Sequence, residues 1–385
     1  MMKRLLIIDG NALVHRAFHA LPSLRTKKGE LVNAVYGFLS IFIKSIEQFS
    51  PDYVCACFDL AAPTFRHKEF KDYKATRAKA PDGLYEQIPK IKEILNKFEV
   101  PIYEEKGFEA DDVIATISKH PRVEEIESII LSGDLDTLQL VDTNTKVFTS
   151  RKGLKDTILY DEKAVKERYG LSPIQIPDLK GLMGDVSDNI PGVKGIGVKT
   201  AAGLLQRFGS LEGIYEVIEK GIQKEEKKSS TPEVGEESAN PSTGSGETSS
   251  SFASPTPGVL EDLTPGVLPA EESEGSIEES LTPGVFPSES KTDSSSSTPR
   301  VFEESFPGVS VKPRIKKMLL ENKEQAFFSR MLAQVKQDVD ISFDIDKCVW
   351  KGFDRPQAIQ ALRVFEFNTL INRLPIKKAQ QDRLF

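Results

Sequence analysis

Short apolar runs alternate with amphipathic stretches along the first 224 residues of the chain. Four runs have the length and apolar character of buried strands, and they cover residues 3–8, 53–58, 128–131 and 146–149. Stretches with the apolar spacing of a helix lie between them, at residues 34–49, 85–98 and 111–119. This alternation predicts an α/β fold with a parallel central sheet flanked by helices. Residues 315–339 and 356–374 are also predicted to be helical.

Residues 225–311 interrupt this pattern. Ser, Glu, Pro, Thr and Gly dominate the segment, which has too few apolar residues to offset the entropy of ordering it, so a long disordered insert is predicted. A TPGV unit recurs at irregular spacing, first at Thr256–Val259. We interpret the repeats as a duplicated linker, and an array of partner-docking sites is the competing interpretation.

Charge is distributed unevenly over the 385 residues. The insert holds 17 acidic and 4 basic residues, whereas the rest of the chain holds 41 acidic and 47 basic ones, so an acidic segment divides a basic body. Three cysteines are too few to stabilise a secreted fold through disulfide bonds. No stretch approaches the roughly 18 uninterrupted apolar residues that a spanning helix needs. We therefore expect a cytoplasmic, nucleoid-associated protein that does not associate with a membrane.

Acidic residues follow the predicted strands. In parallel sheets the carboxyl ends of the strands form the ligand-binding edge, so these side chains are expected to converge. One further pair, Asp185 and Asp188, has the i, i+3 spacing that places both on one face of a helix. The candidates are Asp9, Asp59, Glu109, Asp111, Asp112, Asp134, Asp136, Asp185 and Asp188.

Such a concentration of carboxylates predicts a metal site. Packed together without cations, the groups would repel one another and tend to hold protons. Donors that are all oxygen, without His or Cys, favour Mg²⁺ or Mn²⁺ over zinc. Two such ions can activate water and stabilise a phosphodiester transition state. The competing interpretation is that single residues cap helices or form turns, as Asp112 could at the helix that Asp111 enters.

A basic run occupies residues 66–79, directly after the second acidic strand end. It holds six Lys/Arg and one His against two acids. If the run is helical, Lys74 and Arg77 share a face, and Tyr73 offers a plane for stacking. We expect Arg66, Lys71 and Tyr73 to contact a phosphate chain and Lys74 and Arg77 to offset charge at the scissile group. A merely solvated face is the other interpretation.

The segment 191–203 is rich in glycine and opens a helix. Its glycines allow a tight turn with outward-facing backbone N–H groups, which together with a helix N-terminus bind phosphates without reading sequence. The Rossmann fingerprint is excluded because no buried strand precedes the segment. The expected DNA contacts are Gly192, Lys194, Gly195, Gly197, Lys199 and Thr200.

Taken together, these motifs resemble the 5′ nuclease family, which includes the 5′-3′ exonuclease domain of bacterial DNA polymerase I, stand-alone bacterial exonucleases and flap endonucleases. The matching stretches are LLIIDGNALVHRAFHAL, CFDLAAPTFRHKEFKDYKATR, GFEADDVIATI, LSGDLDTLQL and LMGDVSDNIPGVKGIGVKTAAGLL. The resemblance implies a PIN-like sheet, a helical arch that carries Tyr73, Lys74 and Arg77, and a helix-hairpin-helix that holds K⁺ through its carbonyls. It also implies that the nine acids listed above are metal ligands or, for Asp112, a neighbour of them.

The implied organisation has five parts. They are a PIN-like nuclease domain at 1–170, a helix-hairpin-helix subdomain at 171–224, the insert at 225–311, closing helices at 312–375 and a flexible tail at 376–385. Because the chain stops where polymerase I would continue, we expect a stand-alone bacterial form without polymerisation. In the tail, Gln381, Leu384 and Phe385 match a sliding-clamp docking pattern, and a frayed end is the competing interpretation.

The leading hypothesis is a structure-selective 5′-3′ exonuclease or flap endonuclease. Its substrate would be DNA with a 5′ flap, nick or primer end, and two Mg²⁺ or Mn²⁺ ions would catalyse hydrolysis of the phosphodiester bond. The reaction would take place in DNA replication and repair. The alternative is a non-catalytic DNA-binding scaffold that uses the hairpin and the basic run while its tail recruits repair partners.

Overall fold

The computed structural model describes residues 2–153, 156–229 and 311–375. Most of the predicted insert and all of the predicted clamp-binding tail therefore lie outside the described residues. Within the described ranges, no helix combines the length and the apolar character that crossing a membrane requires.

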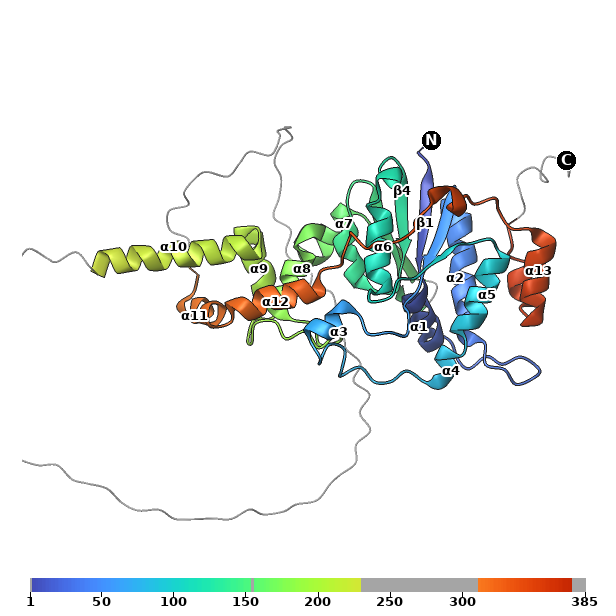
Figure 1. The fold of residues 1–385 in the computed structure, drawn as a ribbon, viewed down its shortest axis with the longest axis horizontal. Helices are drawn as coiled ribbons and strands as arrows, with labels where there is room; N and C mark the ends of the chain where they lie inside the picture. The colour runs from blue at the N-terminus through green and yellow to red at the C-terminus, as the bar shows by residue number, and fades with distance from the viewer. Residues whose placement is uncertain (1, 154–155, 230–310, 376–385) are drawn as a thin grey trace, which may run out of the picture. The chain divides into compact units, whose positions relative to one another are not determined.

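A six-stranded sheet forms the centre of the fold (Figure 1). Its strands are β1 (Arg4–Asp9), β2 (Tyr53–Cys57), β3 (Ile102–Tyr103), β4 (Glu127–Leu131), β5 (Thr145–Lys152) and β6 (Asp156–Tyr160). The order is β3-β2-β1-β4-β5-β6, and every pairing from β3 to β5 is parallel. Only β6 runs antiparallel, and just three positions of the sequence separate it from β5. The predicted α/β class with a mostly parallel sheet is confirmed.

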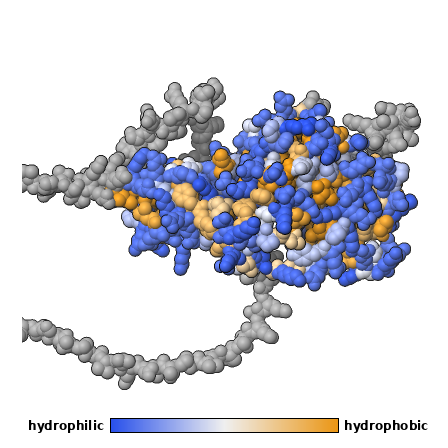
Figure 2. All heavy atoms as spheres, in the orientation of Figure 1, coloured by the Kyte–Doolittle hydropathy of each residue, from blue (hydrophilic) through white to orange (hydrophobic). Residues whose placement is uncertain are grey.

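Alternation along β1 divides the core into two layers. Leu6 and Ile8 face one side of the sheet, where α1 (Gly10–Ala20), α2 (Asn33–Phe49), α5 (Ile88–Lys97) and α13 (Arg355–Val364) cover them. Leu5 and Ile7 face the other side and pack under α6 (Ala110–Ser118). All four side chains are fully buried, as expected for a parallel sheet covered on both faces. Hydrophilic residues cover most of the face shown in Figure 2.

A further hydrophobic cluster lies beside the sheet, and helices supply most of it, with Leu171, Val193, Ile196 and Val311 added from connecting segments. It joins α8 (Ile176–Met183), α9 (Val198–Phe208), the first part of α10 (Leu211–Ser229), α11 (Pro313–Glu321) and α12 (Lys323–Ala333). α7 (Glu162–Tyr169) connects this cluster to the sheet in sequence, and 3₁₀ turns lie at Pro121–Val123, Leu135–Leu140, Pro173–Gln175 and Ile345–Cys348. Helices on both sides of the predicted insert thus share one core.

The predicted helix at 315–339 is corrected by the structure. It breaks at Asn322 between α11 and α12 and ends at Ala333, after which Gln334 is extended. The reason is burial, because the following chain crosses to the sheet and places Val335 and Ile345 in its core. The prediction at 356–374 is likewise interrupted, since Glu366 has a φ of +61° between α13 and α14 (Asn368–Ile371).

The basic run is not one helix either. α3 (Phe65–Glu69) is followed by consecutive turns and, later, by α4 (Asp82–Tyr85). Lys74 lies in these turns with a φ of +58°, and its N–H donates to the Asp188 carbonyl at 2.9 Å. The predicted helical face shared by Lys74 and Arg77 is therefore absent, although both side chains still reach the same cavity.

Candidate active site

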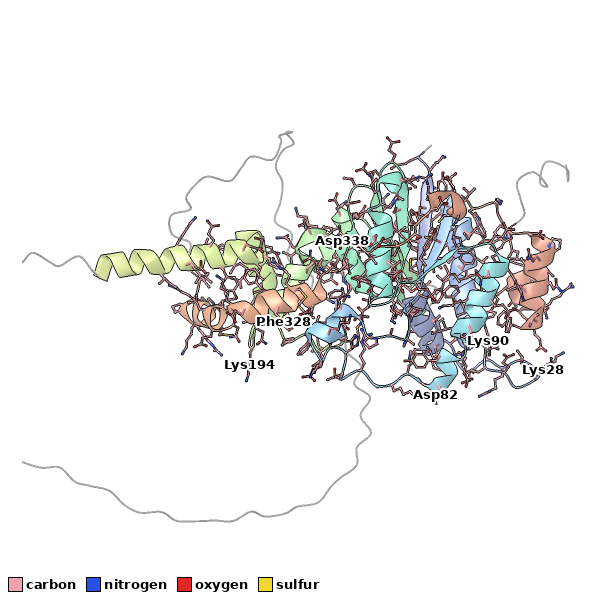
Figure 3. All side chains as sticks on the ribbon, viewed as in Figure 1. Lys28, Asp82, Lys90, Lys194, Phe328 and Asp338 are labelled. Atoms are coloured by element: carbon pink, nitrogen blue, oxygen red, sulfur yellow. The ribbon has the colours of Figure 1, made fainter. Side chains whose placement is uncertain are left out.

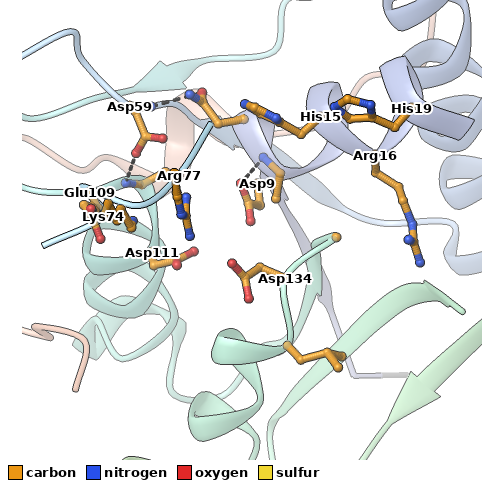
Figure 4. Close-up of a pocket in the computed structure, with 15 residues that line it drawn as sticks. Asp9, His15, Arg16, His19, Asp59, Lys74, Arg77, Glu109, Asp111 and Asp134 are labelled. Carbon is orange, nitrogen blue, oxygen red and sulfur yellow. Dashed lines mark hydrogen bonds and ion pairs between the residues drawn. The ribbon is translucent and has the colours of Figure 1, made fainter. Parts of the chain in front are cut away.

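The carboxyl ends of the strands open onto a cavity of about 550 Å³ (Figure 4). Five predicted acids line it, and they are Asp9, Asp59, Glu109, Asp111 and Asp134. Lys74 and Arg77 lie on the same wall as Glu109, as Figure 4 shows. Residues separated by more than 120 positions in the sequence therefore meet at the sheet edge where the strand pattern predicted them.

Local hydrogen bonds fix Asp9 and Asp134 in this cavity. Asp9 ends β1 and caps α1, accepting the Ala12 N–H at 3.0 Å. It also accepts the Ser132 hydroxyl at 2.5 Å, and the same hydroxyl accepts the Asp134 N–H at 2.9 Å. Ser132 thereby connects the end of β4 to the end of β1. Asp9 both caps α1 and lines the cavity, so its predicted role as a metal ligand and the competing interpretation as a helix cap are compatible.

The N-terminus of α6 brings the next two acids to the cavity. Glu109 is the N-cap of α6, and Asp111 lies in its first turn. Asp59 accepts the Ala110 N–H at 2.7 Å and so joins the chain after β2 to the start of this helix. Negative side chains suit this position because the helix dipole is positive there.

A second group of acids lies next to the cavity, and basic side chains compensate its charge. Lys180 of α8 bridges Asp136 and Asp185. Asp188 pairs with Arg77 and lies 3.8 Å from the Lys74 ammonium, which is also 2.7 Å from Glu109. Asp185 and Asp188 belong to a turn closed by the Asp185–Ile190 bridge and not to a helix, which corrects the predicted helical face.

Asp9 and Asp111 of the cavity differ in pKa from Asp185 beside it, whereas burial and Asp134 raise the pKa of Asp136 to about 7 despite its pairing with Lys180. Burial, together with the charges of Asp134 and Asp59, raises the pKa of Asp9 to about 7. Burial and the carboxylates of Asp9 and Asp134 also raise the pKa of Asp111 well above its ordinary value. At Asp185 burial acts in the same direction, but the Lys180 ammonium and Ser187 outweigh it and lower its pKa to about 2.

The cavity has the chemistry of a site for hard divalent cations. Among the described residues, no three His, Cys, Asp or Glu side chains already lie close enough to enclose an ion. Five carboxylates nevertheless line one cavity, and burial together with neighbouring carboxylates raises the pKa values of Asp9 and Asp111. Oxygen donors of this kind fit Mg²⁺ or Mn²⁺. The residues therefore fit the predicted ions.

Asp112 does not join this group. Its side chain is fully buried and accepts both Arg66 guanidinium nitrogens at 2.8 and 2.9 Å. It also accepts the N–H groups of Glu109 and Lys336 at 3.0 and 2.8 Å. The structure thus corrects the assignment of Asp112 as a ligand, because its oxygens are occupied by a structural ion pair.

Arg66 and Tyr73 are corrected for the same reason. Arg66 is 2% exposed and, besides Asp112, binds the carbonyls of Leu332 and Gln334, so it is no surface DNA contact. Tyr73 is 3% exposed, and its hydroxyl donates to Glu109 and Asp188 at 3.1 and 3.0 Å, so it presents no stacking plane. Lys71 is exposed, as its predicted role requires.

The glycine hairpin, which we define as residues 191–197, lies between α8 and α9. Gly192 and Gly195 have φ angles of +61° and +87°, which glycine adopts without strain, and Gly197 is the N-cap of α9. Lys194 and Lys199 are exposed and Thr200 is half-buried, and Figure 3 shows Lys194 projecting outward. Gly192 is corrected as a phosphate donor, since its N–H already donates to the Ser329 hydroxyl at 3.0 Å.

Sequence reasoning missed one wall of the cavity and one bridging cation. His15, Arg16 and His19 of α1 line the side opposite Lys74 (Figure 4), and Asn11 of the same helix also lines the cavity and accepts the Asp59 N–H at 3.2 Å. Burial, His19 and Arg77 lower the pKa of His15. The spacing of four between residues 11, 15 and 19 was a usable signal, because it places them on one helix face directly after Asp9. Lys180 gave no such signal, since one of its two partners is 44 residues away.

Two family models match consecutive parts of the chain. Residues 4–170 match the 5′-3′ exonuclease N-terminal resolvase-like domain, and residues 171–239 match the 5′-3′ exonuclease C-terminal SAM fold. Together they cover more than half of the sequence. The chain belongs to the 5′-3′ exonuclease family. The predicted family resemblance is thereby confirmed.

Similar proteins include longer polymerases and solved nucleases. DNA polymerase I of Bacillus subtilis is 34% identical over 381 residues, and the match covers 99% of this chain and 33% of the relative. DNA polymerase I of Caldicellulosiruptor bescii is 46% identical over 219 residues, 56% of the chain and 26% of the relative. The chain thus spans a third or less of these relatives. A zinc-bound 5′-exonuclease of T5 is 25% identical with a TM-score of 0.46, covering 57% of this chain and 79% of that one.

Proposed function

We propose that this chain is a divalent-metal-dependent 5′-3′ exonuclease and flap endonuclease that hydrolyses DNA phosphodiester bonds in replication and repair. Membership of the 5′-3′ exonuclease family supports the reaction class. The observation that carries the proposal is the convergence of five carboxylates on one cavity with Lys74 and Arg77 beside them. A pure DNA-binding scaffold would have no use for buried carboxylates gathered in one cavity.

Two Mg²⁺ or Mn²⁺ ions would be held by Asp9, Asp59, Glu109, Asp111 and Asp134, with Asp136, Asp185 and Asp188 adjacent. When bound, such ions supply a water activated for attack and positive charge for the attacking and leaving oxygens. Lys74 and Arg77 offset the charge of the scissile phosphate from the neighbouring wall. His15 and His19 line the cavity on the opposite side.

Substrate selection rests on the hairpin and the basic run. Lys194, Gly195, Gly197, Lys199 and Thr200 surround the N-terminus of α9, where backbone donors and ammonium groups hold DNA phosphates without reading bases. K⁺ at the hairpin carbonyls would strengthen that contact. We expect DNA with a 5′ flap, nick or primer end to satisfy both the hairpin and the cavity, because such DNA joins a duplex to a single-stranded end.

A cleavage assay on a labelled 5′-flap DNA tests the proposal. We expect products with Mg²⁺ or Mn²⁺ and none after EDTA, while DNA binding persists without metal at low salt. Binding without cleavage in every metal would favour the DNA-binding scaffold instead.

We also propose that Gln381, Leu384 and Phe385 dock on the sliding clamp. The proposal rests on their sequence pattern, in which two apolar side chains would enter a groove and the amide would bond at its edge. Deleting residues 381–385 should abolish clamp pull-down and leave turnover on naked DNA unchanged, and undiminished pull-down would refute it.

A further inference from the structure

One helix connects the glycine hairpin to the acidic cavity. α12 passes α8, and its last turn lies beside α3 at the start of the basic run (Figure 1). The two ends of α12 make different hydrogen bonds, one set to the hairpin and one set to residues that support the cavity.

The hairpin end depends on two side chains of α12. Ser329 is fully buried and accepts the Gly192 N–H at 3.0 Å. Gln325 lies one turn earlier and donates to the Gly192 carbonyl at 3.0 Å. Both backbone groups of Gly192 are therefore held by the same helix. The turn has little room to shift, because a Cβ at Gly192 would lie 2.2 Å from the Gly184 nitrogen.

The other end of α12 supports the cavity. The carbonyls of Leu332 and Gln334 accept the Arg66 guanidinium at 2.8 and 3.0 Å, and Arg66 in turn contacts Glu109 at 3.3 Å. Leu332 and Ala333 also pack in one buried cluster with Tyr73 and Ile190. Tyr73 bonds to Glu109, and Ile190 closes the turn that carries Asp185.

A third contact reaches the end of β4. Gln139 donates to the Ala333 carbonyl at 3.1 Å and accepts the Val335 N–H at 3.0 Å. Gln139 belongs to the 3₁₀ turn that Asp134 caps. The end of α12 is thus joined to the segments that carry Glu109, Asp134 and Asp185.

α12 has the rigidity to fix a distance. Ser329 and Gln325 precede Leu332 by three and seven residues, so about 4.5 and 10.5 Å of continuous helix separate the two hairpin contacts from the first cavity contact. A helix of this length packed on α8 transmits displacement as a unit, whereas a loop would absorb it.

We propose that Ser329 and Gln325 are positioning residues that set where the DNA is cut. This inference rests on the proposed function, in which the hairpin holds the duplex and the cavity cleaves the strand. By locking Gly192 to α12, the two side chains fix the distance between the duplex anchor and the cavity, and so select one phosphodiester relative to the junction of the flap.

The test uses the full chain and a 5′-flap DNA whose products are resolved to single nucleotides. Ser329→Ala and Gln325→Ala each remove one hydrogen bond to Gly192, and the double variant removes both. Loss of one such bond corresponds to about fivefold in an equilibrium. We expect KM to rise about fivefold in each single variant, with kcat within twofold of wild type. We also expect products one or two nucleotides on either side of the normal cut.

Matched variants separate positioning from general damage. Glu324→Ala changes an exposed residue of the same helix and should keep both KM and the cut site. Ser329→Thr keeps the hydroxyl and should restore the single product. Gln325 is exposed, so its variant should fold even where a change at buried Ser329 lowers the melting temperature.

The outcomes distinguish the two claims. If the wild type cleaves the flap and the folded Gln325→Ala and double variants keep its KM and product pattern, the positioning inference is overturned alone. A loss of kcat with an unchanged product pattern also overturns it, because that result reports only structural damage. If the wild type leaves the flap intact in Mg²⁺ and Mn²⁺, the proposed function fails and the inference fails with it.

Discussion

Asp9 and Asp111 in the cavity and Asp185 and Asp188 just beside it reach their charge balance in opposite ways. Asp9 and Asp111 lie among other acids, and burial with those neighbours raises the pKa of both. Lys180, Arg77 and Lys74 instead pair with Asp185 and Asp188. One group needs cations from solution, whereas the other receives them from the chain.

This difference indicates a division of labour. Acids that already have ammonium or guanidinium partners hold the turn 185–190 and the basic run against each other, whatever the metal content. Acids without such partners remain available as ligands, at the cost of repulsion while no cation is bound. The following experiments, from the largest expected effect to the smallest, test whether the two groups behave so differently.

Removing a cavity acid should have the largest effect. We expect Asp134→Ala to lower the cleavage rate of a 5′ flap by about 1,000-fold or more, because it deletes a ligand where transition-state charge is stabilised. Duplex binding at low salt should be retained. Asp340→Ala, at an exposed acid remote in sequence from the strand ends, serves as the control. Robust cleavage by the Asp134 variant would refute the metal assignment.

The buried Arg66–Asp112 pair should instead report on folding. Asp112→Ala leaves the Arg66 charge buried without its partner, so we expect the free energy of unfolding to fall by about 3 kcal/mol. Asp82→Ala breaks the exposed pair with Lys79 and should change it by less than about 1 kcal/mol. Denaturant titrations of both variants measure the contrast. Equal stability of the two would mean that Asp112 is not a structural residue.

The cavity was more predictable from the sequence than the supports around it. Asp9, Asp59 and Asp134 follow apolar strands, and the rule that parallel strands present their carboxyl ends together is enough to bring them into one place. Local sequence patterns did not predict side chains whose partners are distant in the sequence. Arg66 and Asp112 are 46 residues apart, and nothing in the basic run marks Arg66 as buried while Lys71 is exposed.

The periodicity of the sequence also predicted helices near the site where the structure has turns or extended chain. An i, i+3 spacing fits a helix and a closed turn equally well, so Asp185 and Asp188 share a site without sharing a helix. Residues 334–339 continue the predicted helix in pattern, but burying Val335 against the sheet favours an extended path. In both cases a tertiary contact decided between conformations that the local sequence permits.

The pH dependence of stability should separate Asp9 from Asp185 next. Between about pH 4 and 7 the unfolded chain has lost the Asp9 proton while the metal-free native protein retains it, so stability falls as pH rises. We expect the free energy of unfolding in EDTA to drop by about 2 kcal/mol from pH 5 to 7. Asp9→Asn should remove the Asp9 share of this decline and leave the share of Asp111 and Asp136, whose pKa values are also raised. Mg²⁺ should restore the wild type at pH 7. A wild-type profile that is flat in EDTA would contradict the raised pKa.

The smallest effect should come from removing the lysine that pairs with the acids beside the cavity. Lys180→Gln removes the shared partner of Asp136 and Asp185, so we expect the metal-free protein to lose about 1 kcal/mol at pH 7. The lowered pKa of Asp185 contributes stability above about pH 4 that is lost as pH falls toward 2, so the deficit of the variant should shrink in acid. Mg²⁺ should raise the melting temperature of Lys180→Gln more than that of the wild type, because a cation then replaces the missing ammonium. An equal rise in both proteins would show that the acids beside the cavity are unavailable to metal even without Lys180.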